Sequence, residues 1–349
     1  MTTRPLLLTR DPHLVDDLRR LAAVAGIEPD VATSAADARR TWSSASVVVV
    51  GDDLVDEAAR AGLRRRADVV VATLGSDVDV PWRSALALGA EHVVVLPTAE
   101  TFLVERLAAG DGAALRRATV IGIVGGTGGS GASVLAAALS VSSARRGHST
   151  VLVDADPMSG GLDLLLGCEN RIGARWQQLS DVTGVLAADD LRTALPSIHG
   201  VDVLAVSRSG DVAVPTSAVP AVLDSAVSAY DVVVLDLPRG HPDLLEQLVA
   251  RCDDVLLVVP LDVRGASASV RLAAWLSARA RTGLVARHLP HSHLDADDLA
   301  TWLELEVAAE LAHDRRIAAA IDQGEAPGLA PRTRLARTCS GLVTGLVVR

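Results

Sequence analysis

The sequence predicts an α/β protein of two domains, each built on a doubly wound parallel sheet. Short runs rich in Val, Leu and Ile alternate with amphipathic helical patterns along both halves of the 349 residues. The alternation stops at residues 108–118, which contain Gly110 and Gly112, and then restarts with a strand that leads into the densest glycine cluster of the chain. We therefore expect domains at residues 1–110 and 119–349, joined by a linker at 111–118.

The first half is expected to hold five strands separated by helices. The segment 12–24 is the clearest helix, because Leu14, Leu18, Leu21 and Ala22 fall on one face. Strand, helix and strand in regular alternation favour a small (βα)5 domain. The expected strands lie at 6–9, 31–33, 46–50, 68–72 and 92–96.

The apolar runs of the second half lack the alternation of apolar and polar residues that a sheet with one solvent-exposed face would show. We therefore expect helices on both faces of this sheet. Long amphipathic segments at 132–146, 242–250 and 265–280 would supply that cover. The expected strands lie at 118–124, 150–154, 201–206, 230–236, 253–260 and 282–286.

Composition excludes several classes of function. All 33 basic residues are arginine, so Schiff-base chemistry on a lysine is ruled out. The net charge of −10 argues against broad binding to nucleic acid or anionic lipid, and an aromatic content of 2% leaves few platforms on which bases could stack. We therefore expect no nucleic-acid partner and at most a peripheral contact with membranes.

The cysteines Cys168, Cys252 and Cys339 form no paired motif, which favours a reducing compartment and buried, inert thiols. The N-terminal segment has too short an apolar run for a signal peptide, and about 18 consecutive apolar residues occur nowhere. These features predict a cytoplasmic protein.

A glycine-rich loop follows the first strand of the second half and opens a helix, which is the context of a phosphate-binding loop. Its glycines would allow backbone N–H groups to converge on a phosphate at the positive end of the helix. Ser133 is placed to bind Mg²⁺. The loop consists of Gly126, Thr127, Gly128, Gly129, Ser130, Gly131, Ala132 and Ser133.

Carboxylates follow two later strands. Asp154 and Asp156 end the strand at 150–154, and Asp236 ends the strand at 230–236. Each aspartate alone is more simply read as a helix cap. Together with the loop they predict a hydrated Mg²⁺ site at the carboxyl edge of the sheet, with Ser133, Asp154 and Asp236 as its metal-facing residues.

These motifs resemble the deviant-Walker ATPases of the MinD and ParA group: Gly126–Ser133, VDADP at 153–157 and YDVVVLDLP at 230–238. The segment 312–329 is similar to that group's closing segment. A receiver-like domain in front of such a module resembles the CpaE/TadZ branch, which positions pilus and secretion machinery and has actinobacterial members described as septum-site determining.

The resemblance implies bound ATP or ADP with Mg²⁺, a homodimer, and protein partners in pilus, secretion or division machinery at a cell pole or septum. It also implies that Ser133 and Asp236 hold Mg²⁺, that Asp154 braces the metal and loop, and that Asp156 orients the attacking water. Asp163 would lie in the switch that follows.

The sequence departs from the family at both lysines, which fall on Thr127 and Ala132, and at the strand end LVARH (284–288), which lacks the family's asparagine. Cationic groups of this kind contribute about 10³–10⁵ in rate to phosphoryl transfer. We therefore expect a spatial organiser that binds ATP weakly or not at all and hydrolyses it poorly.

The alternative is an active ATPase that dimerises with ATP. A DNA-segregation ATPase is disfavoured by charge, and an iron–sulfur electron donor by cysteine placement.

An arginine could replace the missing lysines, since a guanidinium binds phosphate through two N–H groups. Arg239, after the Asp236-Leu-Pro turn, and Arg264, after the strand at 253–260, are the candidates by position. Two solvated arginines are the simpler interpretation.

The first half resembles a response-regulator receiver. Asp11 would belong to its acidic pocket, and Asp52 or Asp53 would be the phosphoacceptor. Leu96 stands before Pro97 where receivers carry a lysine, so a protein-interaction or dimerisation domain is favoured over a phosphorylated one.

Two further segments have a functional and a simpler interpretation. The stretch 332–349 could lie on a membrane surface, but a last helix packed on the sheet is favoured. The cluster His288, His291 and His293 could bind a metal, but a polar surface loop is favoured because no fourth ligand has a defining spacing.

Overall fold

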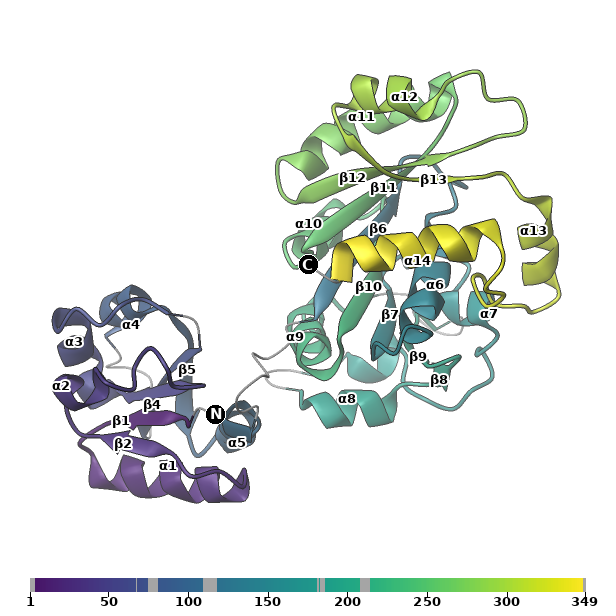
Figure 1. Ribbon diagram of the computed structural model, residues 1–349. Coiled ribbons are helices and arrows are strands. Elements are labelled where there is room, and N and C mark those ends of the chain that lie inside the picture. The colour runs from purple at the N-terminus through teal and green to yellow at the C-terminus, as the bar shows by residue number, and fades with distance from the viewer. Residues whose placement is uncertain are drawn as a thin grey trace. The chain divides into compact units, whose positions relative to one another are not determined.

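The computed structural model describes residues 4–66, 68–74, 81–108, 118–180, 182, 186–207 and 214–347. The chain divides into two compact units, Met1–Arg116 and Arg117–Arg349 (Figure 1).

The first unit is a five-stranded parallel sheet with the strand order β2-β1-β3-β4-β5. This confirms the predicted doubly wound (βα)5 domain. Its strands are β1 (Leu6–Leu8), β2 (Asp30–Ala32), β3 (Val48–Gly51), β4 (Val69–Leu74) and β5 (Ala90–Leu96). Its helices are α1 (Pro12–Val24), α2 (Ala35–Ala38), α3 (Asp52–Arg60), α4 (Trp82–Leu88) and α5 (Glu100–Ala108).

Helix α1 shows how the sequence sets an element of this unit. Asp11 caps it by accepting hydrogen bonds from the N–H groups of His13 and Leu14, and Pro12 occupies its first turn, where no N–H is needed. The predicted apolar face is buried against the sheet. The central strands are apolar on both sides because a core cluster covers each face.

The second unit is an eight-stranded sheet with the order β13-β12-β11-β6-β10-β7-β9-β8, parallel except for the β8–β9 pair. The predicted parallel fold is confirmed. Its strands are β6 (Thr119–Gly125), β7 (Thr150–Asp154), β8 (Ser197–Ile198), β9 (Val201–Leu204), β10 (Val232–Asp236), β11 (Asp254–Pro260), β12 (Arg281–Arg287) and β13 (Glu306–Leu311). The sequence did not reveal β8 and β13, because β8 has two residues and β13 is an edge strand with exposed, glutamate-containing positions.

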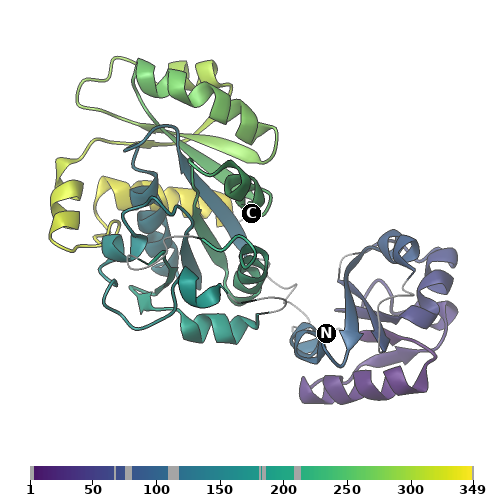
Figure 2. The same cartoon turned by 180° about the vertical axis from the view of Figure 1, so that it is seen from behind.

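Helices cover both faces of this sheet. One core cluster packs α9, α10, α11 and α12 on one face, and another packs α6, α7 and α14 on the other (Figure 2). The helical segments are α6 (Ala132–Ala144), α7 (Leu162–Leu166), the 3-10 turn η1 (Trp176–Leu179), α8 (Ala188–Ala194), α9 (Val219–Ala229), α10 (Pro242–Val249), α11 (Val263–Ser277), α12 (Ala296–Leu303), α13 (Arg315–Asp322) and α14 (Arg334–Val347).

Helix α6 is buried along most of its length, between the sheet and α14 (Figure 1). Helix α14 supplies the cover by burying Leu335, Cys339, Leu342 and Val343. The predicted packing of the last helix within this unit is therefore what the structure shows. No helix in the described part of the chain is long and apolar enough to cross a membrane.

Candidate phosphate and metal site

The loop from Gly125 to Gly131 joins β6, in the middle of the sheet, to α6. Its start is anchored because the N–H of Gly126 donates to the carbonyl of Val258 on β11 at 2.9 Å. A Cβ atom on Gly126 would lie 2.0 Å from Ser269 Oγ of α11, so no larger residue fits without displacement. Gly131 has a φ of +92°, in the region that favours glycine. Close approach and backbone conformation thus explain glycine at these two positions.

No side chain of the N-cap residue occupies the first backbone N–H groups of α6, which follow directly after this loop. Gly131 is its N-cap and offers no side chain that could accept from the helix. The first N–H groups of an α-helix have no partner within the helix, so those of Ala132, Ser133 and Val134 are available to an anion. The positive end of a 13-residue helix adds to that attraction.

The two strand-end carboxylates lie side by side. Asp154 of β7 and Asp236 of β10 are register partners on adjacent parallel strands, with exposed fractions of 0% and 3%. The hydroxyl of Ser133, at the start of α6, faces Asp236 and acts to lower the pKa of that carboxyl. The structure therefore brings Ser133, Asp154 and Asp236 together at the carboxyl edge of the sheet.

Asp154 organises the segment that follows it. Its Oδ2 accepts from Ser159 Oγ at 2.7 Å and from the N–H of Leu162 at 3.1 Å, and its Oδ1 accepts from the N–H of Asp156 at 3.3 Å. Its carbonyl accepts from Trp176 Nε1 at 2.7 Å. These contacts suit a carboxylate that braces the site.

Asp236 is the residue best suited to a cation. Its Oδ2 is buried and has no hydrogen-bond partner among the residues that the structure describes. Burial raises the pKa of Asp236 to about 7, and the neighbouring carboxylates of Asp154 and Asp156 act in the same direction. Burial likewise raises the pKa of Asp154 to about 6. A divalent cation would satisfy the orphaned oxygen and neutralise this charge.

These ligands suit Mg²⁺, which keeps several bound waters, better than a metal ion whose ligands are all protein side chains. No group of three His, Cys, Asp or Glu side chains converges among the described residues. Mg²⁺ keeps several waters and needs only one or two carboxylates, so Asp236 with the Ser133 hydroxyl is a sufficient protein contribution.

The remaining acidic candidates line the segment after β7. Asp156 is half-buried, and its Oδ1 accepts from the N–H of Met158 at 2.9 Å. Asp163 is buried, and its Oδ2 lies 3.4 Å from Arg175 Nε in an ion pair. Asp156 thus stands nearer to solvent than Asp154.

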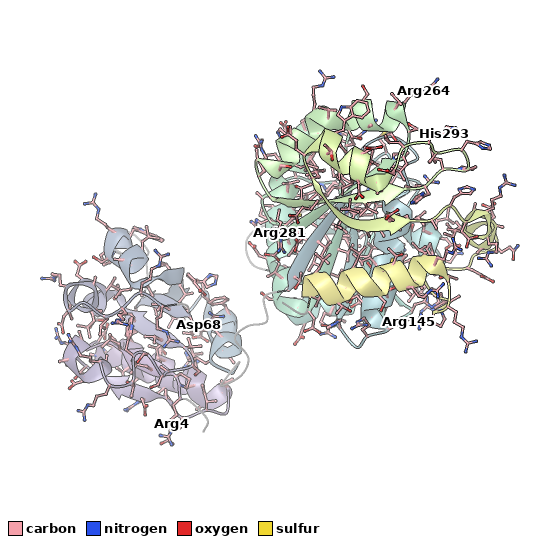
Figure 3. The ribbon with its side chains drawn as sticks, turned by 45° about the horizontal axis from the view of Figure 1, so that its top comes forward. Arg4, Asp68, Arg145, Arg264, Arg281 and His293 are labelled. Carbon is pink, nitrogen blue, oxygen red and sulfur yellow. The ribbon has the colours of Figure 1, made fainter. Side chains whose placement is uncertain are left out.

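Two arginines contact the loop. Arg239 Nη1 donates to the carbonyl of Gly126 at 2.8 Å, and Arg287 Nη1 donates to that of Gly129 at 2.6 Å. Arg264, labelled in Figure 3, is exposed on α11, and no hydrogen bond within the described ranges joins it to the loop. Arg287 was not among the arginines predicted to contact the loop, and it directly follows the expected strand 282–286.

A cavity of about 320 Å³ adjoins the helix end of the loop. Its walls include Gly131, Leu135, Arg287, Ile317 and Leu335, so it is largely apolar with a basic residue where it meets the loop. A second cavity, of about 440 Å³, is bordered by Ser133, Ser159, Gly161 and residues of α7 and α13.

In the first unit, the candidate phosphoacceptors are held by neighbouring donors. Asp52 Oδ2 accepts from Thr73 Oγ1 at 2.5 Å, and Asp53 accepts from Thr9 Oγ1 and from the N–H of Arg10, both at 2.8 Å. Leu96 is buried and apolar, where a receiver would place its cation.

Of the histidine cluster, His288 Nε2 lies 2.6 Å from Glu310 Oε2, an edge-strand contact. The cluster belongs to no metal-ligating group in the part of the chain that the structure describes.

Comparison with known families divides the chain in the same manner. The family model for the Rv3660c-like, CheY-like N-terminal domain matches residues 8–118, and that for cellulose biosynthesis protein BcsQ matches residues 118–313. The Mycobacterium tuberculosis protein Rv3660c is 35% identical over 319 residues, covering 90% of both chains. The septum site-determining protein MinD of Helicobacter pylori is 32% identical over 181 residues, covering 49% of this chain and 65% of MinD.

Solved structures resemble the second unit. A ParA family ATPase from Chlorobium tepidum superposes with a TM-score of 0.59 at 16% identity, covering 67% of this chain and 99% of the other. The MinD cell division protein of Aquifex aeolicus gives 0.54 at 21% identity, with coverages of 66% and 98%. At these identities the likeness establishes the fold.

Proposed function

The chain belongs to the MinD/ParA superfamily of P-loop ATPases, in the group that joins a CheY-like domain of the Rv3660c type to a BcsQ-type module, and from this premise we propose that it is a spatial organiser with a weakened nucleotide site. The site would bind ATP or ADP with Mg²⁺ at low affinity and hydrolyse ATP slowly. Its output would be the position of other proteins rather than a chemical product.

The observation that carries this proposal is a site with its backbone and acidic parts present and both lysine positions neutral. The open N-terminus of α6 and the buried Asp236 can receive phosphate and a cation. Thr127 and Ala132 supply no positive charge. Phosphoryl transfer depends mainly on neutralising charge that develops on the phosphates, so turnover suffers more than ground-state binding.

When bound, Mg²⁺ would supply positive charge that offsets the negative charge of the phosphates. Ser133 and Asp236 are the residues that would hold it, and Asp154 would keep the segment after β7 in place. The loop residues from Gly126 to Ser133 would donate backbone N–H groups, and Asp156 would orient water if hydrolysis occurs.

The proposed partners are a second copy of the chain and proteins of pilus, secretion or division machinery, at a cell pole or septum. The support comes from relatives: MinD proteins are named as septum site-determining, and MinD of Aquifex aeolicus is known in a complex with MinC. The resemblance of the whole arrangement to the CpaE/TadZ branch favours pilus or secretion machinery as strongly as the septum.

For the first unit, we propose a protein-interaction role without phosphorylation. Asp52 and Asp53 are bonded to neighbouring hydroxyl and N–H groups, and the buried Leu96 offers no cation to a phosphoryl group. Incubation with acetyl phosphate and Mg²⁺, followed by intact-mass measurement, should show no added phosphate. A phosphate adduct lost in Asp52→Asn or Asp53→Asn would overturn this assignment.

An active, ATP-dependent dimerising ATPase is the competing function, and the arginine contacts to the loop favour it. Calorimetric titration with ATP and ADP in Mg²⁺, with steady-state hydrolysis and self-association, separates the two. We expect weak binding and little turnover from the native chain, and tighter binding in Ala132→Lys. Fast hydrolysis by the native chain, abolished in Asp156→Ala, would refute the weakened site.

A further inference from the structure

We propose that Arg287 is the phosphate-binding cation of the loop and contacts the phosphates nearest the nucleoside, which ADP and ATP share. This inference rests on the proposed nucleotide site. It assigns a function to a residue that lies outside the glycine loop and outside both candidate arginine positions.

The position of Arg287 is fixed by the sheet. It is the last residue of β12, paired in register with Pro260 of β11 and Leu311 of β13. Its carbonyl accepts from the N–H of Leu261 at 2.9 Å. The backbone is thus held at the carboxyl edge of the sheet, where the loop lies, and only the side chain has to be ordered.

The guanidinium reaches the helix end of the loop. Besides its bond to the Gly129 carbonyl, Nη1 would lie 3.6 Å from a Cβ atom on Gly131, the N-cap of α6. It therefore lies beside Gly131, the residue that precedes the first N–H groups of α6. Asp236 Oδ2, buried and without a hydrogen-bond partner among the described residues, independently indicates that a cation belongs at this edge.

Arg287 forms no ion pair with any residue in the described part of the chain. Asp314, an acidic residue in the wall of the adjoining cavity, is bonded to Arg316, with Oδ2 to Nη2 at 2.7 Å and Oδ1 to Nε at 2.9 Å. A guanidinium stays protonated and has five N–H donors, so several remain for a ligand after the Gly129 bond.

The adjoining 320 Å³ cavity sets which phosphates Arg287 meets. Arg287 and Gly131 form its border with the loop, while Leu135, Ile317 and Leu335 give it apolar walls. A nucleotide with its phosphates at the α6 N-terminus and its nucleoside in this cavity passes Arg287 at the junction. Arg239, bonded to Gly126 at the start of the loop, lies nearer the other end.

The test is calorimetric titration of the full chain with ADP and with ATP in Mg²⁺. We expect Arg287→Ala and Arg287→Gln to weaken both nucleotides by a similar factor, about 10- to 100-fold, since a charge-assisted hydrogen bond contributes in that range. Arg271→Ala is the matched control, because it removes an exposed arginine of α11 that no hydrogen bond among the described residues joins to the loop, and it should leave both affinities unchanged.

The glutamine variant separates charge from loop support. Glutamine keeps an N–H donor without the charge, on a side chain two bonds shorter than that of arginine, and the unfolding midpoint of the variant reports whether the fold is intact. Loss of affinity in folded Arg287→Gln supports the proposal. Retained affinity in Arg287→Gln, with loss only in Arg287→Ala, overturns it by showing that Arg287 merely supports the loop.

The failures are distinguishable. If the native chain binds nucleotide and the Arg287 variants bind equally well, the inference about Arg287 is wrong and the nucleotide site stands. If the native chain binds neither nucleotide in Mg²⁺, the proposed site is wrong and the inference falls with it.

Discussion

Replacing Asp236 with Asn should stabilise the protein at alkaline pH in the absence of Mg²⁺. Asp236 is buried, its Oδ2 has no hydrogen-bond partner in the described part of the chain, and its pKa is raised from 3.8 to about 7. The variant keeps an oxygen that can accept from Ser133 and removes the charge.

The magnitude and sign follow from linkage between protonation and folding. Below about pH 4 the carboxyl is protonated in both states and contributes nothing. Between about pH 4 and pH 7 the unfolded chain loses the proton while the folded protein retains it, so the free energy of unfolding falls as pH rises. Above pH 7 the full penalty is reached, about 4 kcal/mol for a pKa raised by about three. About 3 kcal/mol of it develops between pH 5 and pH 8.

Urea unfolding at pH 5 and pH 8, with chelator present, measures this difference. The native chain should lose stability over that range, and Asp236→Asn should lose about 3 kcal/mol less. Asp190→Asn, which changes an exposed aspartate of α8, is the control and should behave like the native chain. Added Mg²⁺ at pH 8 should stabilise the native chain and leave Asp236→Asn unchanged. Equal pH dependence in the native chain and Asp236→Asn would refute the reasoning that Asp236 is buried, charged and unpaired.

The other predictions concern packing and reactivity. Gly126→Ala should lower the free energy of unfolding by about 2–4 kcal/mol, because its Cβ would collide with Ser269 Oγ, and Ser269→Ala in the same chain should recover part of this loss in urea unfolding. Trp176→Phe should cost about 1–3 kcal/mol by the same measurement, since the buried carbonyl of Asp154 loses its Nε1 donor; an unchanged midpoint would contradict that. Cys339, buried and with its pKa raised to about 12, should resist iodoacetamide at pH 8 until urea unfolds the chain, and rapid labelling of native protein detected by peptide mass would argue against the α14 packing.

The grouping of Ser133, Asp154 and Asp236 could be anticipated because it depends on a general rule. Parallel strands end at one edge of a sheet, so residues that directly follow apolar runs share that edge and meet where their strands are neighbours. The uniformly apolar runs at β7 and β10 mark the strand ends well, and these two strands are adjacent. A different pattern, the apolar face of the stretch 332–349, predicted α14 as a packed helix.

The contact of Arg287 with Gly129 could not be anticipated, because it depends on strand order and side-chain direction. Strand β12 lies two places from β6, with β11 between them. The local sequence LVARH does not indicate that its arginine side chain reaches past β11 to the loop. Arg264, which is equally suited by its position in the sequence, is exposed. The edge strand β13 was not predicted either, because its partly exposed positions lack the apolar run by which a strand is recognised in the sequence.

The burial of α6 on nearly every side affects how the affinity of its N-terminus for an anion can be changed. A helix held between a sheet and α14 has already lost its conformational freedom when the chain folds, so a ligand at its end has little backbone to immobilise. The affinity of this end of the helix for an anion then depends more on charge than on shape. We expect a single cationic substitution in such a preorganised frame to raise that affinity without redesign of the surrounding scaffold.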